Sequence, residues 1–425
     1  MLRNLLIKSS STEQISASIA HNMRWLLYDG VLASASLAII NTYFTLYLES
    51  LGASNQQIGL TASLTNLMLL LTMLPGAWMT EKIGSRKIAV LLSAGGLSRL
   101  FLLVSVFLPF WFTRQAAVLP VVVARLLMDN FSVLSLPAWT SLSADIVPMQ
   151  WRGRYFAARN MLMNISTMLA TLAIGRLIFT IGQPGGYQAA LGVAAGLGFM
   201  ATYAYARIRE PRAEGLGAAA ASYAPKALLE TLKADPLLRN YSLFLLLWNC
   251  TINFAGPFFA IYFVRELNGT PDVIGVLTTI LTLVSIPAAL FTGKLVDRWG
   301  ARRAQIVTGF LIPLLPILWI LPRSPWALIP VYIYDGIAWT GYALASFSFM
   351  LTLASPARLT RYNAIAQMMV AFSSALGPLL GGLMIAQWGY RTVFFISGVG
   401  RLLAMLFYLR FVRQPAAAQM DAASS

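Results

Sequence analysis

Long apolar runs separated by short clusters of charge form the main pattern of this chain. Between Asp272 and Lys294 lie 21 uncharged positions, and between Arg361 and Arg391 lie 29. A hydrocarbon core about 30 Å thick is crossed by about 20 apolar helical residues. These runs are apolar on all sides, whereas the strands of a membrane barrel alternate apolar and polar positions. The pattern therefore predicts membrane-spanning helices.

We predict twelve such helices in an all-α membrane protein. The predicted spans are 24–48, 57–79, 87–110, 117–141, 156–181, 187–206, 241–264, 272–292, 303–322, 326–353, 362–387 and 392–411.

The segments outside the spans are short. Residues 1–22 are expected to be a cytoplasmic lead-in and not a cleavable signal peptide, because the polar run 9–14 interrupts any apolar core. Residues 207–239 form a basic linker in which a short amphipathic helix is expected to lie on the inner leaflet. Residues 413–425 are expected to form a cytoplasmic tail.

Composition and charge support a membrane protein and fix its orientation. The chain has 425 residues, of which 58% are hydrophobic and 11% charged, and its mean hydropathy is +0.69. With a cytoplasmic N-terminus, 23 of the 31 Lys and Arg residues lie on the cytoplasmic side, which satisfies the positive-inside rule with both termini in the cytoplasm. The net charge of +16 then faces anionic lipid and does not indicate nucleic-acid binding. We expect a multi-pass protein of the bacterial cytoplasmic membrane.

The chain lacks the residues that most catalytic and metal sites require. His21 is the only histidine and Cys250 the only cysteine. A histidine-based nucleophile system, a metal cluster or a disulfide cannot be assembled from this set. No enzymatic activity, no cofactor and no metal are therefore expected.

Three pairs of matching segments recur along the chain. IGLTASL (58–64) matches IGVLTTI (274–280), and EKIGSRK (81–87) matches DRWGARR (297–303) at the same interval in the numbering. RYFAARNM (154–161) matches RYNAIAQM (361–368) at a slightly shorter interval. A six-helix unit has been duplicated. We therefore expect two pseudo-symmetric halves, residues 23–206 and 240–412.

The second of these pairs carries a family resemblance. The chain resembles the major facilitator superfamily of secondary transporters, whose loops after helices 2 and 8 carry G-x-L-x-D-R-x-G-R-[RK]. The matching residues of the second copy are Gly293, Leu295, Asp297, Arg298, Gly300 and Arg302. The first copy keeps Lys82, Gly84 and Arg86, with Ala77 and Glu81 in place of the first glycine and the aspartate.

The resemblance implies that this motif is a conformational latch. Asp297 would engage the start of helix 5 near Arg152 and Arg154, and Glu81 would engage the start of helix 11 near Arg361. Gly300 would permit a tight turn. The plainer alternative is that these charges only anchor a loop and set the topology.

Charges inside the predicted spans are costly in lipid and so are candidates for function. Arg125 and Asp129 lie four residues apart on one face of helix 4, where they could simply neutralise each other. Alternatively Asp129 is the proton-coupling site, with Asp335 and Asp29 as further candidates. Proton-coupled members of the family carry Arg-x-x-Gln-Gly in helix 4, and only Arg125 matches it.

The resemblance also implies which helices line the substrate cavity. Candidate lining residues on helices 5, 7 and 10 are Arg176, Trp248, Asn249, Asn253, Tyr334, Trp339 and Tyr342. Packing is the alternative role for the aromatic ones. Pro257 predicts a kink in helix 7. Arg99 and Arg401, on helices 3 and 12, are expected to bond to backbone or to a neighbouring acid.

Three functions remain open at this point. The first is a monomeric, proton-coupled exporter of small amphiphilic compounds that works by alternating access. The second is a proton-coupled uptake symporter for a sugar or an organic anion, with Arg125 and Arg176 as anion contacts. The third is a lipid flippase. The lipid bilayer is a partner in each case.

Overall fold

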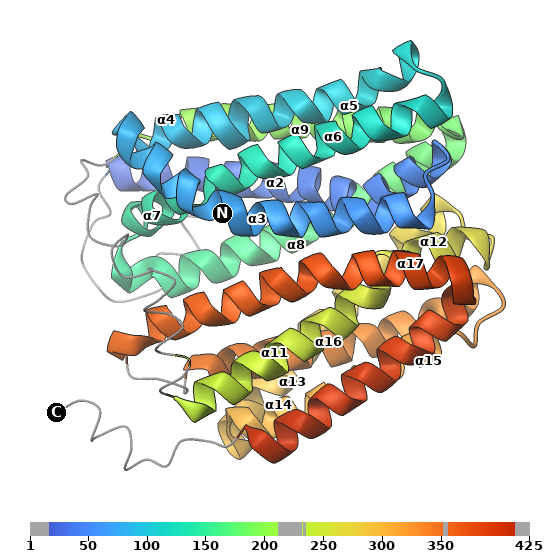
Figure 1. Ribbon diagram of the computed structural model, residues 1–425. Coiled ribbons are helices and arrows are strands. Elements are labelled where there is room, and N and C mark those ends of the chain that lie inside the picture. The colour runs from blue at the N-terminus through green and yellow to red at the C-terminus, as the bar shows by residue number, and fades with distance from the viewer. Residues whose placement is uncertain (1–16, 211–231, 233–234, 352–355, 413–425) are drawn as a thin grey trace. The chain divides into compact units, whose positions relative to one another are not determined.

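The computed structural model describes residues 17–210, 232, 235–351 and 356–412. Within these ranges every regular element is a helix (Figure 1). The predicted all-α class is confirmed. Most of the predicted lead-in, linker and tail, including the predicted surface helix, lie outside the described residues.

The helices of the first part of the chain follow the predicted spans. They are α2 (Ala17–Ser50), α3 (Asn55–Ile83), α4 (Arg86–Val90), the π-helix η1 (Leu91–Ser98), α5 (Arg99–Trp111), α6 (Arg114–Leu134), α7 (Leu136–Ile146), α8 (Met149–Ile181) and α9 (Gly185–Ala206). The segments α4, η1 and α5 are consecutive, as are α6 and α7 apart from Ser135.

The helices of the second part also follow the predicted spans. They are α11 (Pro236–Ala255), α12 (Phe258–Arg265), α13 (Pro271–Trp299), α14 (Ala301–Gly309), α15 (Leu314–Leu318), the 3-10 helix η3 (Pro325–Leu328), α16 (Ile329–Leu351) and α17 (Pro356–Phe411). The kink predicted at Pro257 is confirmed, because α11 ends at Ala255 and α12 begins at Phe258. Gly389, with φ 75° and ψ 170°, divides α17 into two helices.

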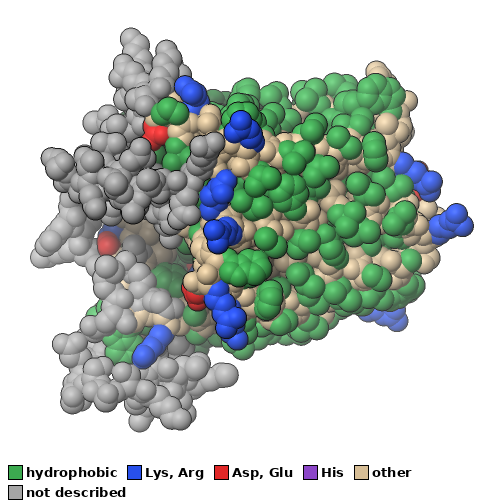
Figure 2. Space-filling model, turned by 90° about the horizontal axis from the view of Figure 1, so that it is seen from below, with side chains coloured by type: hydrophobic (Ala, Val, Ile, Leu, Met, Phe, Trp, Pro, Cys, Tyr) green, Lys and Arg blue, Asp and Glu red, His purple; other side chains and the backbone are tan. Residues whose placement is uncertain are grey.

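Length and composition qualify these helices for a membrane. In the described part of the chain, nine helical stretches are long and apolar enough to span a bilayer, and one of them, Ile365–Phe411, contains the break at Gly389. Figure 2 shows hydrophobic side chains over the broad middle of the visible face and Lys and Arg side chains towards its ends. The count of twelve and the cytoplasmic termini stay predictions.

The chain divides into two compact units. Unit one comprises residues 1–44 and 71–216, and unit two comprises residues 45–70 and 217–425. The end of α2 and the start of α3 thus belong with the second unit. Close packing explains this, because a Cβ at Gly59 of α3 would lie 2.4 Å from the carbonyl oxygen of Pro378 in α17.

The backbone repeats at the same two intervals as the sequence. All the residues with positive φ in the described chain form three pairs. Gly52 pairs with Asn268 and Gly84 with Gly300 at the interval of the motif, and Gly182 pairs with Gly389 at the shorter one. Positive φ values suit glycine and, less readily, asparagine. Both halves therefore turn at matching positions.

The turn predicted at Gly300 is confirmed. Its φ of 78° lies between the end of α13 and the start of α14.

A buried tyrosine repeats in the same way. The hydroxyl of Tyr155 donates to the carbonyl oxygen of Met23 at 2.7 Å and so ties α8 to α2. The hydroxyl of Tyr362, its counterpart in the second half, donates to the Asp235 carboxylate, which also caps the start of α11. In each half this tyrosine connects the start of the fifth predicted helix to the first.

Replacing Gly300 by alanine tests whether these turns need glycine. The conformation of Gly300, φ 78° and ψ 155°, is one that costs a residue with a Cβ about 1–3 kcal/mol. We expect Gly300→Ala to lower the melting temperature of the purified protein. Gly293→Ala is the matched control, because Gly293 lies in α13 with open space around its would-be Cβ. Equal melting temperatures for the two variants would contradict this account of the turn.

Candidate functional site

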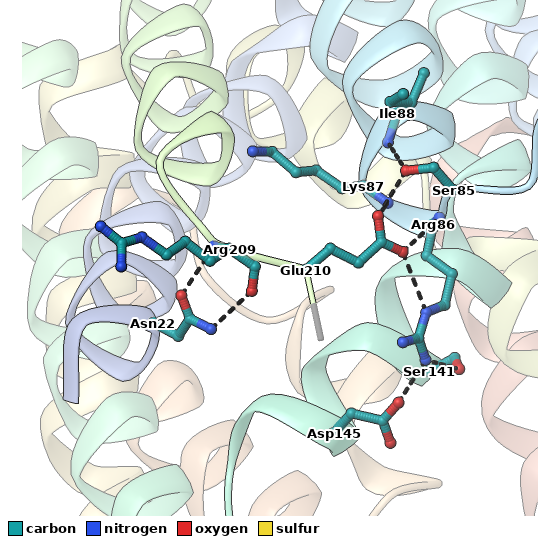
Figure 3. Close-up of polar contacts among 9 residues, drawn as sticks. All are labelled: Asn22, Ser85, Arg86, Lys87, Ile88, Ser141, Asp145, Arg209 and Glu210. Atoms are coloured by element: carbon teal, nitrogen blue, oxygen red, sulfur yellow. Dashed lines mark hydrogen bonds and ion pairs between the residues drawn. The ribbon is translucent and has the colours of Figure 1, made fainter. Parts of the chain in front are cut away.

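The motif arginine of the first half lies in a cluster of acids within unit one (Figure 3). Arg86 is 3% exposed, and its Nη1 lies 2.5 Å from Asp145 Oδ2 at the end of α7. Its Nε lies 3.5 Å from Oε1 of Glu210, which follows α9. The backbone N–H of Arg86 and the hydroxyl of Ser85 also donate to the Glu210 carboxylate, at 2.9 Å and 2.6 Å. The cluster fixes the start of the predicted linker against α4.

A second contact holds the same segment to α2. Asn22 Nδ2 donates to the carbonyl oxygen of Arg209 at 2.8 Å, and the N–H of Arg209 donates to Asn22 Oδ1 at 2.9 Å (Figure 3). Asn22 is 6% exposed. The chain leaving α9 is therefore fixed on both sides before the undescribed residues begin.

The second half makes the matching contacts with backbone oxygens. Arg302, the counterpart of Arg86, donates from Nε to the carbonyl oxygen of Val412 at 2.8 Å and from Nη2 to that of Leu409 at 3.2 Å. Asn240 donates to the carbonyl oxygen of Phe411 at 3.2 Å. The free carbonyls at a helix C-terminus carry partial negative charge, which favours a nearby arginine. Each motif arginine thus fixes the chain at or just after the end of the last predicted helix in its own half.

These contacts differ from the role predicted for the motif. Asp297, Arg298, Lys82 and Arg154 are exposed, and the side chains of Glu81, Arg152 and Arg361 lie outside the described part of the chain. Each predicted latch joins residues of different units, which are described separately. The latch stays a prediction, whereas Arg86 and Arg302 have defined partners within their units.

Asp145, Glu210 and Asn22 were not predicted from the sequence as members of this cluster. Asp145 lies 59 residues from Arg86 and Glu210 lies 124 residues away. Isolated acids at the ends of apolar runs are the signal that could have suggested Asp145 and Glu210.

A pair of opposite charges lies within one predicted span of unit one. Arg125 Nε lies 2.7 Å from Asp129 Oδ2 on α6, and both side chains are 16% exposed. The guanidinium of Arg125 also lies over the ring of Phe44, 4.7 Å from its centroid. The spacing of four residues therefore brings the two charges together as expected for one helix face.

The other two candidate acids lie in different surroundings. In unit two the charge of Asp335 on α16 interacts with that of Arg401 on α17. Arg401 is 2% exposed and donates to the carbonyl oxygen of Ile252 at 3.4 Å, which confirms its expected bond to backbone. In unit one Asp29 is 9% exposed and accepts a hydrogen bond from Trp139, within reach of the charges of Arg159 and Arg99.

The predicted cavity residues of α11 and α16 lie mostly inside unit two. Trp248 and Tyr342 are 1% and 6% exposed, with ring centroids 4.9 Å apart. The rings of Trp339 and Tyr342 lie edge to face, with their centroids 6.1 Å apart. The hydroxyl of Tyr334 donates to the carbonyl oxygen of Leu311 at 2.9 Å. Packing therefore accounts for these aromatic contacts, and the role of the four residues in binding substrate stays a prediction.

The remaining predicted cavity residues are polar. Asn249 donates to the carbonyl oxygen of Leu245 at 2.9 Å, and Asn253 donates to the hydroxyl of Ser374 at 3.0 Å. Arg176 on α8 is exposed and lies over the ring of Phe179, 5.3 Å from its centroid. Among the residues that the structure describes, no group of three His, Cys, Asp or Glu side chains could hold a metal ion.

The helices define a multi-pass integral membrane protein. Residues 30–256 and 249–423 match the Major Facilitator Superfamily, so the chain belongs to this superfamily of transporters. It is 24% identical over 412 residues to the multi-drug resistance efflux pump PmrA of Streptococcus pneumoniae, covering 91% of this chain and 95% of that protein. It is 26% identical over 388 residues to the multidrug resistance protein MdtG of Salmonella arizonae, covering 86% and 89%.

A solved structure shares the fold. A bacterial homologue of the human lysosomal transporter Spinster, in an inward-facing and unoccupied conformation, superposes with a TM-score of 0.73 at 16% identity. The match covers 95% of this chain and all of that one. The predicted family and fold class are confirmed.

Acid should weaken the cluster around Arg86. Burial alone would raise the pKa of Glu210, but the hydrogen bonds from Ser85 and from the N–H groups of Arg86 and Lys87 outweigh it, so the pKa lies below its ordinary value of 4.5. The carboxylate therefore stabilises the fold fully above pH 4.5 and loses this effect as the pH falls through the lowered pKa. We expect Glu210→Gln to lower the free energy of unfolding by about 1–2 kcal/mol at pH 7 and by less below pH 4.5.

Melting curves of both proteins at a series of pH values measure this difference. Glu266→Gln, at an exposed glutamate, is the control and should melt with the wild type at every pH. A difference between wild type and Glu210→Gln that stays constant through the acid range would disprove the assigned role of this carboxylate.

Proposed function

We propose that the protein is a monomeric, proton-coupled exporter of small amphiphilic compounds that works by alternating access. The proposal depends chiefly on the ion pair between Arg125 and Asp129, which lies inside a predicted span at an N–O distance of 2.7 Å. An ionised carboxylate at this depth is costly and is usually functional. Asp129 is the proton-coupling residue in this proposal.

The pair provides a physical means of exchange between a proton and a substrate. Protonation of Asp129 removes its charge and releases Arg125 from its nearest anion. The freed guanidinium then has only the face of Phe44 and the substrate to interact with, among the contacts described for it. Deprotonation restores the ion pair and displaces the substrate. Proton and substrate thus compete within one site.

The relatives support the direction and the class of substrate. PmrA and MdtG are named for multidrug resistance, and each match covers more than four fifths of both chains. The composition of the spans is consistent with an apolar substrate, because the interior of unit two is rich in aromatic side chains. Small-molecule sites are lined mainly by hydrophobic and aromatic side chains, so such an interior suits compounds that partition into the bilayer.

Two further acids provide the comparison that the proposal needs. Asp335 is partly buried, its Oδ1 has no hydrogen-bond partner in the described structure, and its charge interacts with that of Arg401. Asp29 lies near two arginines. Of these three acids, only Asp129 is joined to an arginine by a direct ion pair in the described structure, so it is the carboxylate whose protonation frees a cation.

Transport by Asp129→Asn in proteoliposomes tests the coupling. With a lipophilic dye as substrate, we expect the pH gradient to drive no accumulation beyond the level seen without a gradient. Exchange of dye down its own concentration gradient should continue, because the amide leaves the fold and the apolar surfaces in place.

Asp335→Asn and Asp29→Asn are the matched controls, since each removes one other intramembrane acid. Both should retain gradient-driven transport. Retention in Asp129→Asn together with loss in Asp335→Asn would move the coupling site to unit two. Retention in all three variants would refute proton coupling through these acids.

A further inference from the structure

Unit one contains a cavity that the proton-coupling pair does not line. Its volume is about 500 Å³, within the range of about 300–1,000 Å³ typical of small-molecule sites. Helices α2, η1, α5, α6, α7, α8 and α9 all contribute to its wall. Arg125 and Asp129 are absent from the wall, and its charged residues are Asp29, Arg99 and Arg159.

The charges of this cavity do not balance. Two guanidinium groups face one carboxylate, and among the described residues no direct ion pair joins Asp29 to either arginine. Asp29 instead accepts a hydrogen bond from Trp139. Nε of Arg99 is buried with no hydrogen-bond partner in the described structure. At least one positive charge is therefore left uncompensated in a low-dielectric interior.

The second arginine is fixed but keeps donors available. Arg159 is 5% exposed, and its Nε donates to the carbonyl oxygen of Leu26 at 3.4 Å. Its guanidinium lies 5.6 Å from the ring centroid of Trp139. The terminal NH₂ groups have no other bond in the described structure apart from this stacking. A planar fork of N–H donors matches the two oxygens of a carboxylate.

Two glycines allow the arginines to lie against their helices. A Cβ at Gly30 of α2 would lie 2.5 Å from Arg159 Nη2, and a Cβ at Gly198 of α9 would lie 2.6 Å from Arg99 Cδ. Any larger residue would push the guanidinium aside. The backbone is thus shaped around the two positive groups.

The rest of the wall combines apolar side chains with hydroxyl and amide groups, and its apolar part reaches the surface of the unit. Leu37 and Leu136, which are 42% and 41% exposed, lie at the wall together with Val90, Leu91 and Met163. Leu91 belongs to the π-helix η1, an element often found at functional sites. A ligand with one acidic end and an apolar body would satisfy both parts of this surface.

We propose that this cavity binds amphiphilic organic monoanions, with the carboxylate of the ligand between Arg99 and Arg159. The anion neutralises the excess positive charge, and the apolar body lies along the leucines. The inference goes beyond the exporter proposed above, because it places a second ligand site in unit one, apart from the Arg125–Asp129 pair. Binding itself can be measured without transport.

Thermal-shift and calorimetric titrations of the purified protein, in nanodiscs of neutral lipid, test the proposal. The probes are octanoate, octanol and octylammonium, which share one chain length and differ in charge. We expect octanoate to bind and to raise the melting temperature, whereas octanol and octylammonium do neither. Binding of all three with similar affinity would overturn the proposal. It would also be overturned if an anionic phospholipid headgroup were the only competitor that displaces octanoate.

Variants locate the binding. Arg159→Gln should weaken octanoate binding about tenfold or more, because a charged hydrogen bond is lost, while Arg159→Lys should retain part of it. Gly30→Ala should also weaken binding, although it removes no charge, because it displaces the guanidinium. Gly196→Ala is its control, since a Cβ there meets nothing within 4 Å. Unchanged affinity in both Arg159→Gln and Gly30→Ala would refute the site.

The outcomes separate this inference from the proposed function. Octanoate binding that depends on Arg159, without any proton-driven transport of octanoate or dye, would leave the site standing and refute the exporter. Proton-driven dye transport in a protein that does not bind octanoate would do the reverse. If Arg159→Gln fails to fold, Gly30→Ala still provides the test, since it alters only the end of a flexible side chain.

Discussion

The cost of a charged side chain in hydrocarbon governs the surroundings of the arginines in the described spans. Along these spans each arginine has an acid, a carbonyl oxygen or an aromatic face beside it. Arg125 has Asp129, Arg401 has the carbonyl of Ile252, and Arg176 has the ring of Phe179. The cavity of unit one is the exception, because there the compensation is incomplete. Incomplete compensation is what makes that cavity a place for a ligand.

The two halves hold the motif arginine with different chemical groups. In the first, Arg86 is held by the carboxylates of Asp145 and Glu210, and the side chain of Asp145 is 52% exposed. In the second, Arg302 is held by neutral carbonyl oxygens. Carboxylates respond to salt and acid, whereas carbonyls do not titrate. Salt and acid can therefore alter the contacts of Arg86 in the first half. Glu210, one of its two acidic partners, also lies near the start of the predicted linker between the halves.

Much of the fold could be predicted because hydrophobic length and repetition are local properties of a sequence. The apolar runs located the helices, and the second copy of the motif located the turn at Gly300. The residues of the cavity in unit one could be predicted less completely from the sequence. Arg159 lies close to the end of a predicted span, and only the folded helices place it beside Asp29. Likewise the sequence is equally compatible with Trp248 as a cavity or a core residue until its neighbours are known. In the structure it is 1% exposed and packs against Phe244 and Tyr342.

The paired glycine turns also constrain how the duplicated halves diverged. The stretch from Gly300 to Gly389 in the second half is nine positions shorter than its counterpart from Gly84 to Gly182 in the first. Nine positions are about two and a half turns of an α-helix, at about 3.6 residues per turn. Deleted from inside one helix, they would rotate everything beyond by about half a revolution and turn its buried face towards the lipid. Tyr155 and Tyr362 still point to the first helix of their halves. Only deletions near the helix ends and connections are compatible with that shared orientation.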